Sequence, residues 1–364
     1  MDFYPLKISN IQDETPDTKT FTFEIPDSLV EEFNYYAGQY VTLSIMIDGQ
    51  ECRRSYSICT APHHDRFAIT IKRVVGGTVS NYISDNLKRG DTINVMVPQG
   101  KFKFIPDSNM SRQHYFFAAG SGITPVMSMI ESVLEEEPKS SCHLFYGSKN
   151  EFQIIFKSRL DDLELKYRGQ LYIHYILSRP VRYKADGILG FFGKKVTKWK
   201  GLTGRIDITT LSNFLKDQPM IKPEIQFYLC GPGDFISEVE AYLKSRNIDR
   251  KTIKKEHFVS NASSPKTTLE TVDASVNITL KGEKFNVSVL KDQTILDALK
   301  DIDKDPPHSC SSGACSTCIA KVTKGSVVMD VCYALEDEEI AEGYILTCQS
   351  KPQTENVEIT YDLH

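Results

Sequence analysis

Short runs in which apolar and polar residues alternate dominate the chain up to about residue 105, and this pattern indicates β-strands. The clearest runs are 20–25 (TFTFEI), 40–45 (YVTLSI) and 66–74 (RFAITIKRV). A helical pattern occurs at 79–87. Many short strands that lead into a region of alternating strands and helices predict a small antiparallel β-barrel followed by an α/β domain.

From His114 onward the apolar runs lose their alternation, which is typical of strands that are buried on both faces. The expected strands are 115–119, 143–146, 171–177 and 226–229, and the expected helices are 126–135, 153–165 and 234–245. This order predicts a parallel sheet. Open parallel sheets bind their ligands just past the carboxyl ends of the strands.

The segment 260–271 (SNASSPKTTLET) is rich in serine, threonine and proline, and we interpret it as a flexible linker. Beyond it, the pattern predicts a hairpin, a short helix and two further strands, hence a small α+β domain. These elements are expected at 275–280, 284–289, 294–300, 319–322 and 357–361.

Four cysteines in this last region have the spacing C-x4-C-x2-C with one further cysteine downstream. They are Cys310, Cys315, Cys318 and Cys348. Four thiolates with this spacing are typical of a plant-type [2Fe–2S] cluster. The alternatives are a zinc site or unrelated thiols, but zinc sites prefer paired C-x2–4-C hooks and only one such pair exists here. Cys332 does not fit the spacing, and we treat it as structural.

Two motifs in the barrel region suit a ligand that has a flat ring and phosphates. In 54–57 (RSYS), Tyr56 could stack on the ring and Arg54 could pair with a phosphate. Gly76 and Gly77 precede the predicted helix, and Ser80 lies in its first turn, which makes an anion site suited to pyrophosphate. Each motif alone is more often an ordinary strand or turn, so the hypothesis rests on their occurring together.

A third motif, 120–125 (GSGITP), stands between a predicted buried strand and a predicted helix. Glycines at such a turn let a pyrophosphate approach backbone N–H groups at the helix N-terminus. Ser178 and Arg179 follow the third strand of this region and suit a 2′-phosphate, although Arg179 could instead be a solvated surface cation. Because Lys149 follows the second strand in place of an acidic residue, we favour NADPH over NADH, with NADH as the alternative.

Composition narrows the picture. The chain has 364 residues, 40% hydrophobic and 25% charged, and a net charge of −5, which gives no reason to expect nucleic acid as a partner. Five of the nine cysteines are scattered, unlike a disulfide framework. The N-terminus lacks the features of a signal peptide, and no apolar stretch is long enough for a membrane helix. We therefore expect a soluble, cytoplasmic protein.

R-x-Y-S followed by GG-x-x-S resembles the FAD-binding domain of the ferredoxin–NADP reductase family, and GSGITP, LSR and CGPG resemble its nucleotide domain. The resemblance implies that Ser57 lies near flavin N5, that Cys230 lies beside the nicotinamide, and that Glu256 and Phe258 lie against the flavin. For Cys230 the alternative is an ordinary packed cysteine. The candidate catalytic residues are Ser57, Cys230 and Glu256. The candidate cofactor-binding residues are Arg54, Tyr56, Ser57, Lys72, Gly76, Gly77, Val79, Ser80, Gly120, Gly122, Thr124, Pro125, Ser148, Ser178, Arg179, Cys230, Gly231, Pro232 and Phe258.

About ninety C-terminal residues resemble a plant-type ferredoxin of the β-grasp fold. The whole order resembles the reductase components of multicomponent oxygenases, of the phenylacetyl-CoA epoxidase reductase type. This implies an FAD-binding β-barrel (1–110), an NAD(P)-binding α/β domain (111–258), a linker (259–273) and a [2Fe–2S] domain (274–364). It also implies an oxidoreductase that passes electrons from NADPH through FAD and the cluster to a separate oxygenase, epoxidase or desaturase. The alternatives are a stand-alone NAD(P)H:acceptor reductase and a non-enzymatic iron–sulfur sensor or interaction module.

Two segments could serve partner docking. Residues 182–203 depart from the family pattern and form a segment longer than most loops, in which Phe191, Phe192 and Trp199 are interleaved with lysines. They could meet an acidic partner or a membrane surface, but a surface loop that folds its aromatic residues back onto the domain is the more ordinary interpretation. The acidic helix expected at 335–341 is a solvated face or a docking site for an electron-transfer partner.

Overall fold

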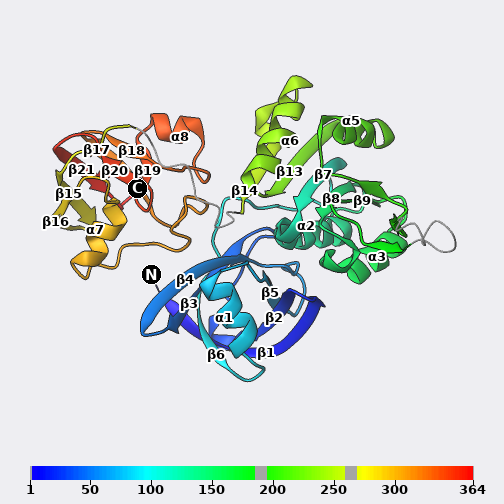
Figure 1. Cartoon of the computed structure of the whole chain (residues 1–364), viewed down its shortest axis with the longest axis horizontal. Coiled ribbons are helices and arrows are strands. Elements are labelled where there is room, and N and C mark those ends of the chain that lie inside the picture. The colour runs from blue at the N-terminus through cyan, green and yellow to red at the C-terminus, as the bar shows by residue number, and fades with distance from the viewer. Residues whose placement is uncertain (1, 185–194, 259–268, 364) are drawn as a thin grey trace. The chain divides into compact units, whose positions relative to one another are not determined.

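The computed structural model describes residues 2–184, 195–258 and 269–363. These residues form two compact units. One contains the described residues of 1–3, 42–55 and 259–364, and the other contains 4–41 and 56–258. Figure 1 shows the three expected kinds of domain in chain order: a β-rich N-terminal part, an α/β middle part and a small α+β C-terminal part.

The N-terminal strands form a six-stranded sheet in the order β4-β3-β6-β1-β2-β5, in which β2 pairs with β1 on one side and with β5 on the other, both antiparallel. Its elements are β1 (Phe3–Thr15), β2 (Thr18–Glu24), β3 (Tyr40–Ile47), β4 (Gln50–Ser57), β5 (Phe67–Lys72), α1 (Thr78–Asn86) and β6 (Thr92–Met96). The predicted antiparallel architecture is therefore confirmed. The alternation pattern did not predict strand β1, because irregularities at Ile8/Asn10 and Asp13/Thr15 shift its register and interrupt the alternation.

The middle part is built on a six-stranded sheet in the order β12-β9-β8-β7-β13-β14, and all five of its pairings are parallel. The strands are β7 (Arg112–Ala119), β8 (Ser141–Ser148), β9 (Leu171–Leu177), β12 (Leu202–Thr203), β13 (Glu224–Gly231) and β14 (Ile253–His257). The helices are α2 (Ile123–Glu136), α3 (Lys157–Lys166), α5 (Ile208–Asp217) and α6 (Gly233–Ser245). The sequence did not predict α5, although Asp207 and Thr210 form a capping box at its start.

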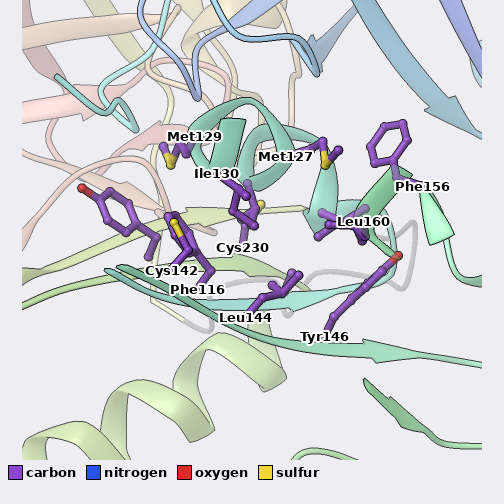
Figure 2. Close-up of a cluster of buried hydrophobic side chains, with 14 of the residues drawn as sticks. Phe116, Met127, Met129, Ile130, Cys142, Leu144, Tyr146, Phe156, Leu160 and Cys230 are labelled. Carbon is purple, nitrogen blue, oxygen red and sulfur yellow. The ribbon is translucent and has the colours of Figure 1, made fainter. Parts of the chain in front are cut away.

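Helices cover both faces of this sheet. On one face, α2 and α3 pack against Phe116, Leu144 and Cys230, and Figure 2 shows Met127 and Ile130 of α2 set against these strand residues. On the other face, side chains of α5 and α6, such as Phe214 and Val239, complete a second core. Burial on both faces explains why these strands read as continuous apolar runs rather than alternating ones.

The C-terminal part contains a five-stranded sheet in the order β16-β15-β21-β17-β19 and a small pair, β18-β20. Its elements are β15 (Ala274–Leu280), β16 (Glu283–Val289), α7 (Ile295–Asp301), β17 (Ile319–Lys324), β18 (Val327–Met329), α8 (Asp337–Ala341), β19 (Tyr344–Leu346), β20 (Ser350–Pro352) and β21 (Asn356–Thr360). Ile295 and Leu299 of α7 pack onto the sheet core. The α+β architecture expected for this region is confirmed.

The long segment after Arg179 is described only in part, because Phe191 and Phe192 lie outside the described residues. Two short strands, β10 (Arg182–Lys184) and β11 (Lys195–Thr197), pair across it. Trp199 packs against the core of the α/β domain and donates its indole N–H to Leu202 O at 2.9 Å. For Trp199, the interpretation as an aromatic residue folded back onto the domain is confirmed. No helix among the described residues is long and apolar enough to cross a membrane.

A buried carboxylate ties the start of β7 to the end of α2. Glu137 has no exposed surface and accepts hydrogen bonds from Arg112, His114 Nε2 (3.1 Å) and Ser140 Oγ (2.7 Å). The backbone N–H of Asp107 also donates to it at 3.0 Å. Burial alone would raise the pKa of Glu137, but these hydrogen bonds outweigh it and lower the pKa to about 2.

We expect Glu137→Gln to lower the free energy of unfolding at pH 7 by about 3 kcal/mol, because it leaves Arg112 and the other donors without their carboxylate. In the wild type, the stability that this group contributes is complete above the usual glutamate pKa of 4.5 and is lost as pH falls toward about 2. Urea unfolding followed by circular dichroism at several pH values measures both effects. Glu136→Gln, on the neighbouring and partly exposed residue, is the matched control, and an equal loss in both variants would contradict the account.

Candidate functional site

The turn after β7 lies very close to the carboxyl end of the neighbouring strand β13. A Cβ atom at Gly122 would lie 2.1 Å from the carbonyl oxygen of Cys230, so only glycine fits there. Gly120 has a φ of +57°, and its carbonyl accepts a hydrogen bond from Tyr146 OH at 3.0 Å. Thr124 Oγ1 donates to Ser121 O at 2.9 Å. This geometry leaves a bare backbone turn directly before α2, the arrangement that suits a pyrophosphate.

The other candidates of the α/β domain follow the carboxyl ends of β8 and β9. The backbone N–H of Ser178 donates to Ser148 O at 3.0 Å, and that of Arg179 donates to Lys149 O at 2.7 Å. Both Ser178 and Arg179 are exposed. The Ser148 hydroxyl donates to Gln153 O at 2.7 Å, so its hydrogen is already used within the protein. Arg179 is thus better placed than Ser148 to meet a ligand phosphate.

Cys230, Glu256 and Ser57 lie together, although they are far apart in the sequence. Cys230 at the end of β13 is directly beside Glu256 in the parallel register of β13 with β14. Ser57 Oγ, at the end of β4, donates to Glu256 Oε2 at 3.3 Å. Phe258 follows β14, and its N–H donates to Gly231 O at 2.8 Å. Glu256 lies within β14, and its position there is fixed by strand pairing.

Burial sets the protonation of two of these groups. Although Glu256 as a residue is only partly buried, its carboxyl group lies inside the protein, and this burial raises its pKa to about 8 despite the hydrogen bond from Ser57. Burial, together with the nearby Glu256, raises the pKa of the Cys230 thiol well above its usual value. At neutral pH the site therefore holds a neutral thiol and a protonated carboxyl group, which can donate a proton.

The glycine pair before α1 forms a tight turn. A Cβ atom at Gly77 would lie 2.9 Å from Ser80 Oγ, and Ser80 Oγ accepts a hydrogen bond from Val74 N at 3.1 Å. Gly76, with a φ of +72°, is exposed, whereas Val79 is buried in the first turn of α1. This turn presents backbone at a helix start, as an anion site requires.

Three other FAD candidates differ in how they are held. Arg54 is exposed on β4 and donates to the carbonyl of Arg53 at 2.7 Å. Tyr56 is half-buried two residues further along the same strand. Lys72 lies 3.8 Å from Asp17, so this lysine has a carboxylate partner within the protein. Of the three, Tyr56 and Arg54 best fit a ring and a phosphate.

The four candidate cluster ligands fall into two pairs. Cys315 Sγ donates to Cys310 Sγ at 3.1 Å, and Cys318 and Cys348 are buried in one small cluster. A two-iron cluster needs two thiolates for each iron, so the paired arrangement fits it. The hydrogen bond from Cys315, together with those from the backbone N–H of Ser312 and Cys315, lowers the pKa of Cys310 to about 5. This favours the thiolate form at Cys310, whereas the neighbouring cysteines and burial raise the pKa values of the Cys315 and Cys318 thiols well above their usual range.

The loop that carries these cysteines is tightly constrained. At Gly313, with a φ of +72°, a Cβ atom would lie 2.6 Å from Val331 O. The backbone carbonyl of Cys318 accepts hydrogen bonds from the N–H and hydroxyl of Thr347, both at 3.1 Å. Thr347 directly precedes Cys348, so this contact ties the two candidate ligands of the second pair together. Cys332 packs beside this pair, and burial raises its thiol pKa to about 11, in keeping with a structural role.

Some residues that shape the site gave no signal in the sequence. Tyr146, whose hydroxyl holds the turn at Gly120, also accepts from Ile155 N at 3.3 Å. It is fully buried and belongs to an apolar run, so its polar role could not be distinguished from core packing.

Comparison with known proteins agrees with this geometry. Three family models match: an oxidoreductase FAD-binding domain over residues 5–104, an oxidoreductase NAD-binding domain over 116–241 and a 2Fe-2S iron-sulfur cluster binding domain over 278–353. Among solved structures, phthalate dioxygenase reductase has the same fold, with a TM-score of 0.58 and 22% identity over 98% of each chain. The three domains define an NAD(P)H-dependent oxidoreductase that uses FAD and a [2Fe–2S] cluster.

Curated relatives match over the whole chain. One component of the 1,2-phenylacetyl-CoA epoxidase of Escherichia coli is 34% identical, covering 99% of this chain and 98% of the relative. The ferredoxin reductase component of 3-ketosteroid-9-alpha-monooxygenase from Rhodococcus rhodochrous is 30% identical, covering 98% and 96%. The chain belongs to this family of three-domain oxygenase reductase components.

We expect the rate of flavin reduction by NADPH to fall as pH rises through about 8, because Glu256 then loses the proton that it can donate. In Glu256→Gln, the rate should be about tenfold lower and flat between about pH 7 and 9, because an amide neither releases a proton nor titrates in this range. Rapid mixing with absorbance detection measures it. Glu240→Gln on α6 is the control and should keep the inflection. An unchanged inflection in Glu256→Gln would refute this role.

Proposed function

We propose that this chain is the reductase component of a multicomponent oxygenase and that it delivers electrons from NADPH, one at a time, to a separate oxygenase, epoxidase or desaturase. The observation that carries the proposal is the combination, on one chain, of the Cys230–Glu256–Ser57 site with the paired thiols of Cys310/Cys315 and Cys318/Cys348. The named partner systems of the relatives, an epoxidase and a ketosteroid monooxygenase, support an oxygenase as the acceptor.

We assign each group of residues one task. The turn at Gly120 and Gly122 and the edge residues Ser178 and Arg179 bind the dinucleotide. Cys230 packs beside the nicotinamide, and Glu256 with Ser57 holds a proton near the flavin. When bound, the flavin accepts a hydride and releases electrons singly, and the cluster carries one electron at a time. The chain itself supplies orientation, exclusion of water and the position of that proton.

Our remaining assignments follow from the same proposal. FAD lies against Tyr56 and the turn at Gly77, and the domain boundaries are those set out from the sequence, with a linker at 259–273. We also assign the chain to a reducing compartment such as the cytoplasm, because no two cysteines of the described residues form a disulfide.

The two alternatives make different use of the cluster domain. A stand-alone reductase of small acceptors would use the cluster only as an internal conductor, and a sensor would not need a nucleotide site at all. The close fit of Gly122 against Cys230 O, which leaves room for no side chain, favours a chain that binds dinucleotide.

Replacing a cluster ligand tests the proposal. Cys348→Ser should remove the cluster absorbance and lower NADPH-driven cytochrome c reduction by about a hundredfold, because single-electron delivery then lacks its last carrier. Ferricyanide reduction, which the flavin can support, should persist. Cys332→Ser is the matched control in the same domain and should keep both activities. If Cys348→Ser reduced cytochrome c as fast as the wild type, the cluster would not be the route to protein acceptors.

Nucleotide choice is tested at Arg179. We expect Arg179→Ala to lower kcat/KM for NADPH about tenfold or more while changing that for NADH less than about twofold, since only NADPH carries the 2′-phosphate. Steady-state kinetics with both nucleotides measures this. Arg168→Ala removes an exposed arginine elsewhere in the domain and controls for the loss of charge. Equal losses for both nucleotides would contradict the assignment.

A further inference from the structure

The β3–β4 hairpin carries polar side chains that are buried, although side chains of this kind are usually exposed. Arg53 is 9% exposed and Thr42 is 1% exposed, and both belong to the same compact unit as the [2Fe–2S] domain. Arg53 is held in place from within the hairpin, because its Nε and Nη2 donate to Glu51 at 3.0 and 2.9 Å. Ser44 Oγ donates to the same carboxylate at 2.5 Å. The guanidinium is therefore fixed before any further group meets it.

A second edge of this guanidinium, formed by Nη1 and Nη2, contacts the loop that leads to the cluster cysteines. Arg53 Nη1 donates to Asp305 Oδ1 at 2.9 Å, and Nη2 donates to Asp305 Oδ2 at 3.2 Å. This is a fork-to-fork contact, which fixes orientation as well as distance. Arg53 is buried, but the Asp305 side chain is 62% exposed, so water and salt compete for one side of the ion pair.

A second contact lies further along the same loop and sits next to the cluster cysteines. Ser309 Oγ lies 2.6 Å from Ser55 Oγ and 2.8 Å from Thr42 Oγ1, and Ser309 is 2% exposed. Ser309 directly precedes the ligand Cys310, and Ser55 directly precedes Tyr56, a candidate flavin contact. The contact thus joins the loop that carries the cluster cysteines to β4, the strand that carries the candidate flavin contact Tyr56.

We propose that Thr42, Arg53 and Ser55 form a docking surface for the protein's own [2Fe–2S] domain, with the Arg53–Asp305 ion pair as its releasable latch. The surface recognises a short acidic and hydroxyl-bearing segment, Asp305 to Ser309, and holds Cys310 in a fixed position while the cluster loop is docked. Because a polar contact of this kind is weak in water, the domain can also leave the surface and present the same loop to the acceptor protein. This inference rests on the proposed function.

The latch makes a physical prediction that does not require turnover. In oxidised, full-length holoprotein, Asp305→Asn should raise amide hydrogen exchange at 42–55 and 305–309 about fivefold, because a partly exposed ion pair is lost. Asp305→Lys should raise it further, because its ammonium repels Arg53. Thr42→Val, which removes one hydroxyl without changing volume, should act in the same direction. Asp303→Asn, on the same loop, is the matched control and should leave exchange at both segments unchanged.

The same variants are then mixed rapidly with NADPH. In Asp305→Asn, flavin bleaching should keep the wild-type rate, whereas cluster reduction should slow about fivefold and lose its dependence on salt between about 0.05 and 0.5 M NaCl. Exchange and cluster rates in Asp305→Asn that match Asp303→Asn would overturn the docking surface. If NADPH failed to reduce the cluster of the wild type, the proposed function would fail instead, and the exchange result would still decide whether the latch exists.

Discussion

The parallel pairing of β13 with β14 is the constraint on which the reactive site depends. It sets Cys230 beside Glu256 and, through the hydrogen bond of Ser57 to Glu256, joins the end of the antiparallel sheet to the edge of the parallel one. The tight turn at Gly122 lies against the carbonyl of Cys230, which is paired with Glu256, so this turn and the Glu256 carboxyl group lie at the carboxyl ends of neighbouring parallel strands. Because these positions come from strand register and backbone contact, the site is rigid before any ligand binds.

In the C-terminal domain, the positions of the candidate ligands are fixed by side-chain and loop contacts rather than by strand register. The cluster loop has little regular structure, and its shape is fixed by paired thiols, by Gly313 and by the contacts of Thr347 with the carbonyl of Cys318. A rigid catalytic edge and a small, separately held carrier are what a converter between paired and single electrons needs, because each partner must be met in turn. The hydroxyl and ion-pair contacts of the Thr42–Ser55 hairpin give that carrier a place to return to.

Much of this could be predicted from the sequence because the signals were local. The cysteine spacing, the buried runs before GSGITP and CGPG and the glycine pair before α1 each combine a residue type with a position that its neighbours define. Other features depend on contacts between distant residues. No local pattern could place Ser57 beside Glu256 or show that Tyr146 supports the turn at Gly120. Nor could it show that the Ser148 hydroxyl donates its hydrogen bond to Gln153 O. Irregular pairing hid β1, and the position of Glu256 within β14 required the neighbouring strand.

The central claim is that electrons enter this chain in pairs from NADPH and reach one iron–sulfur centre. Anaerobic titration of the purified protein with NADPH, followed by visible absorbance and electron paramagnetic resonance, tests it most directly. The account predicts about two iron atoms per chain, bleaching of the flavin and the appearance of a reduced [2Fe–2S] signal as NADPH is added. Flavin bleaching in a protein that contains no iron–sulfur centre, or whose centre stays oxidised with NADPH in excess, would contradict it.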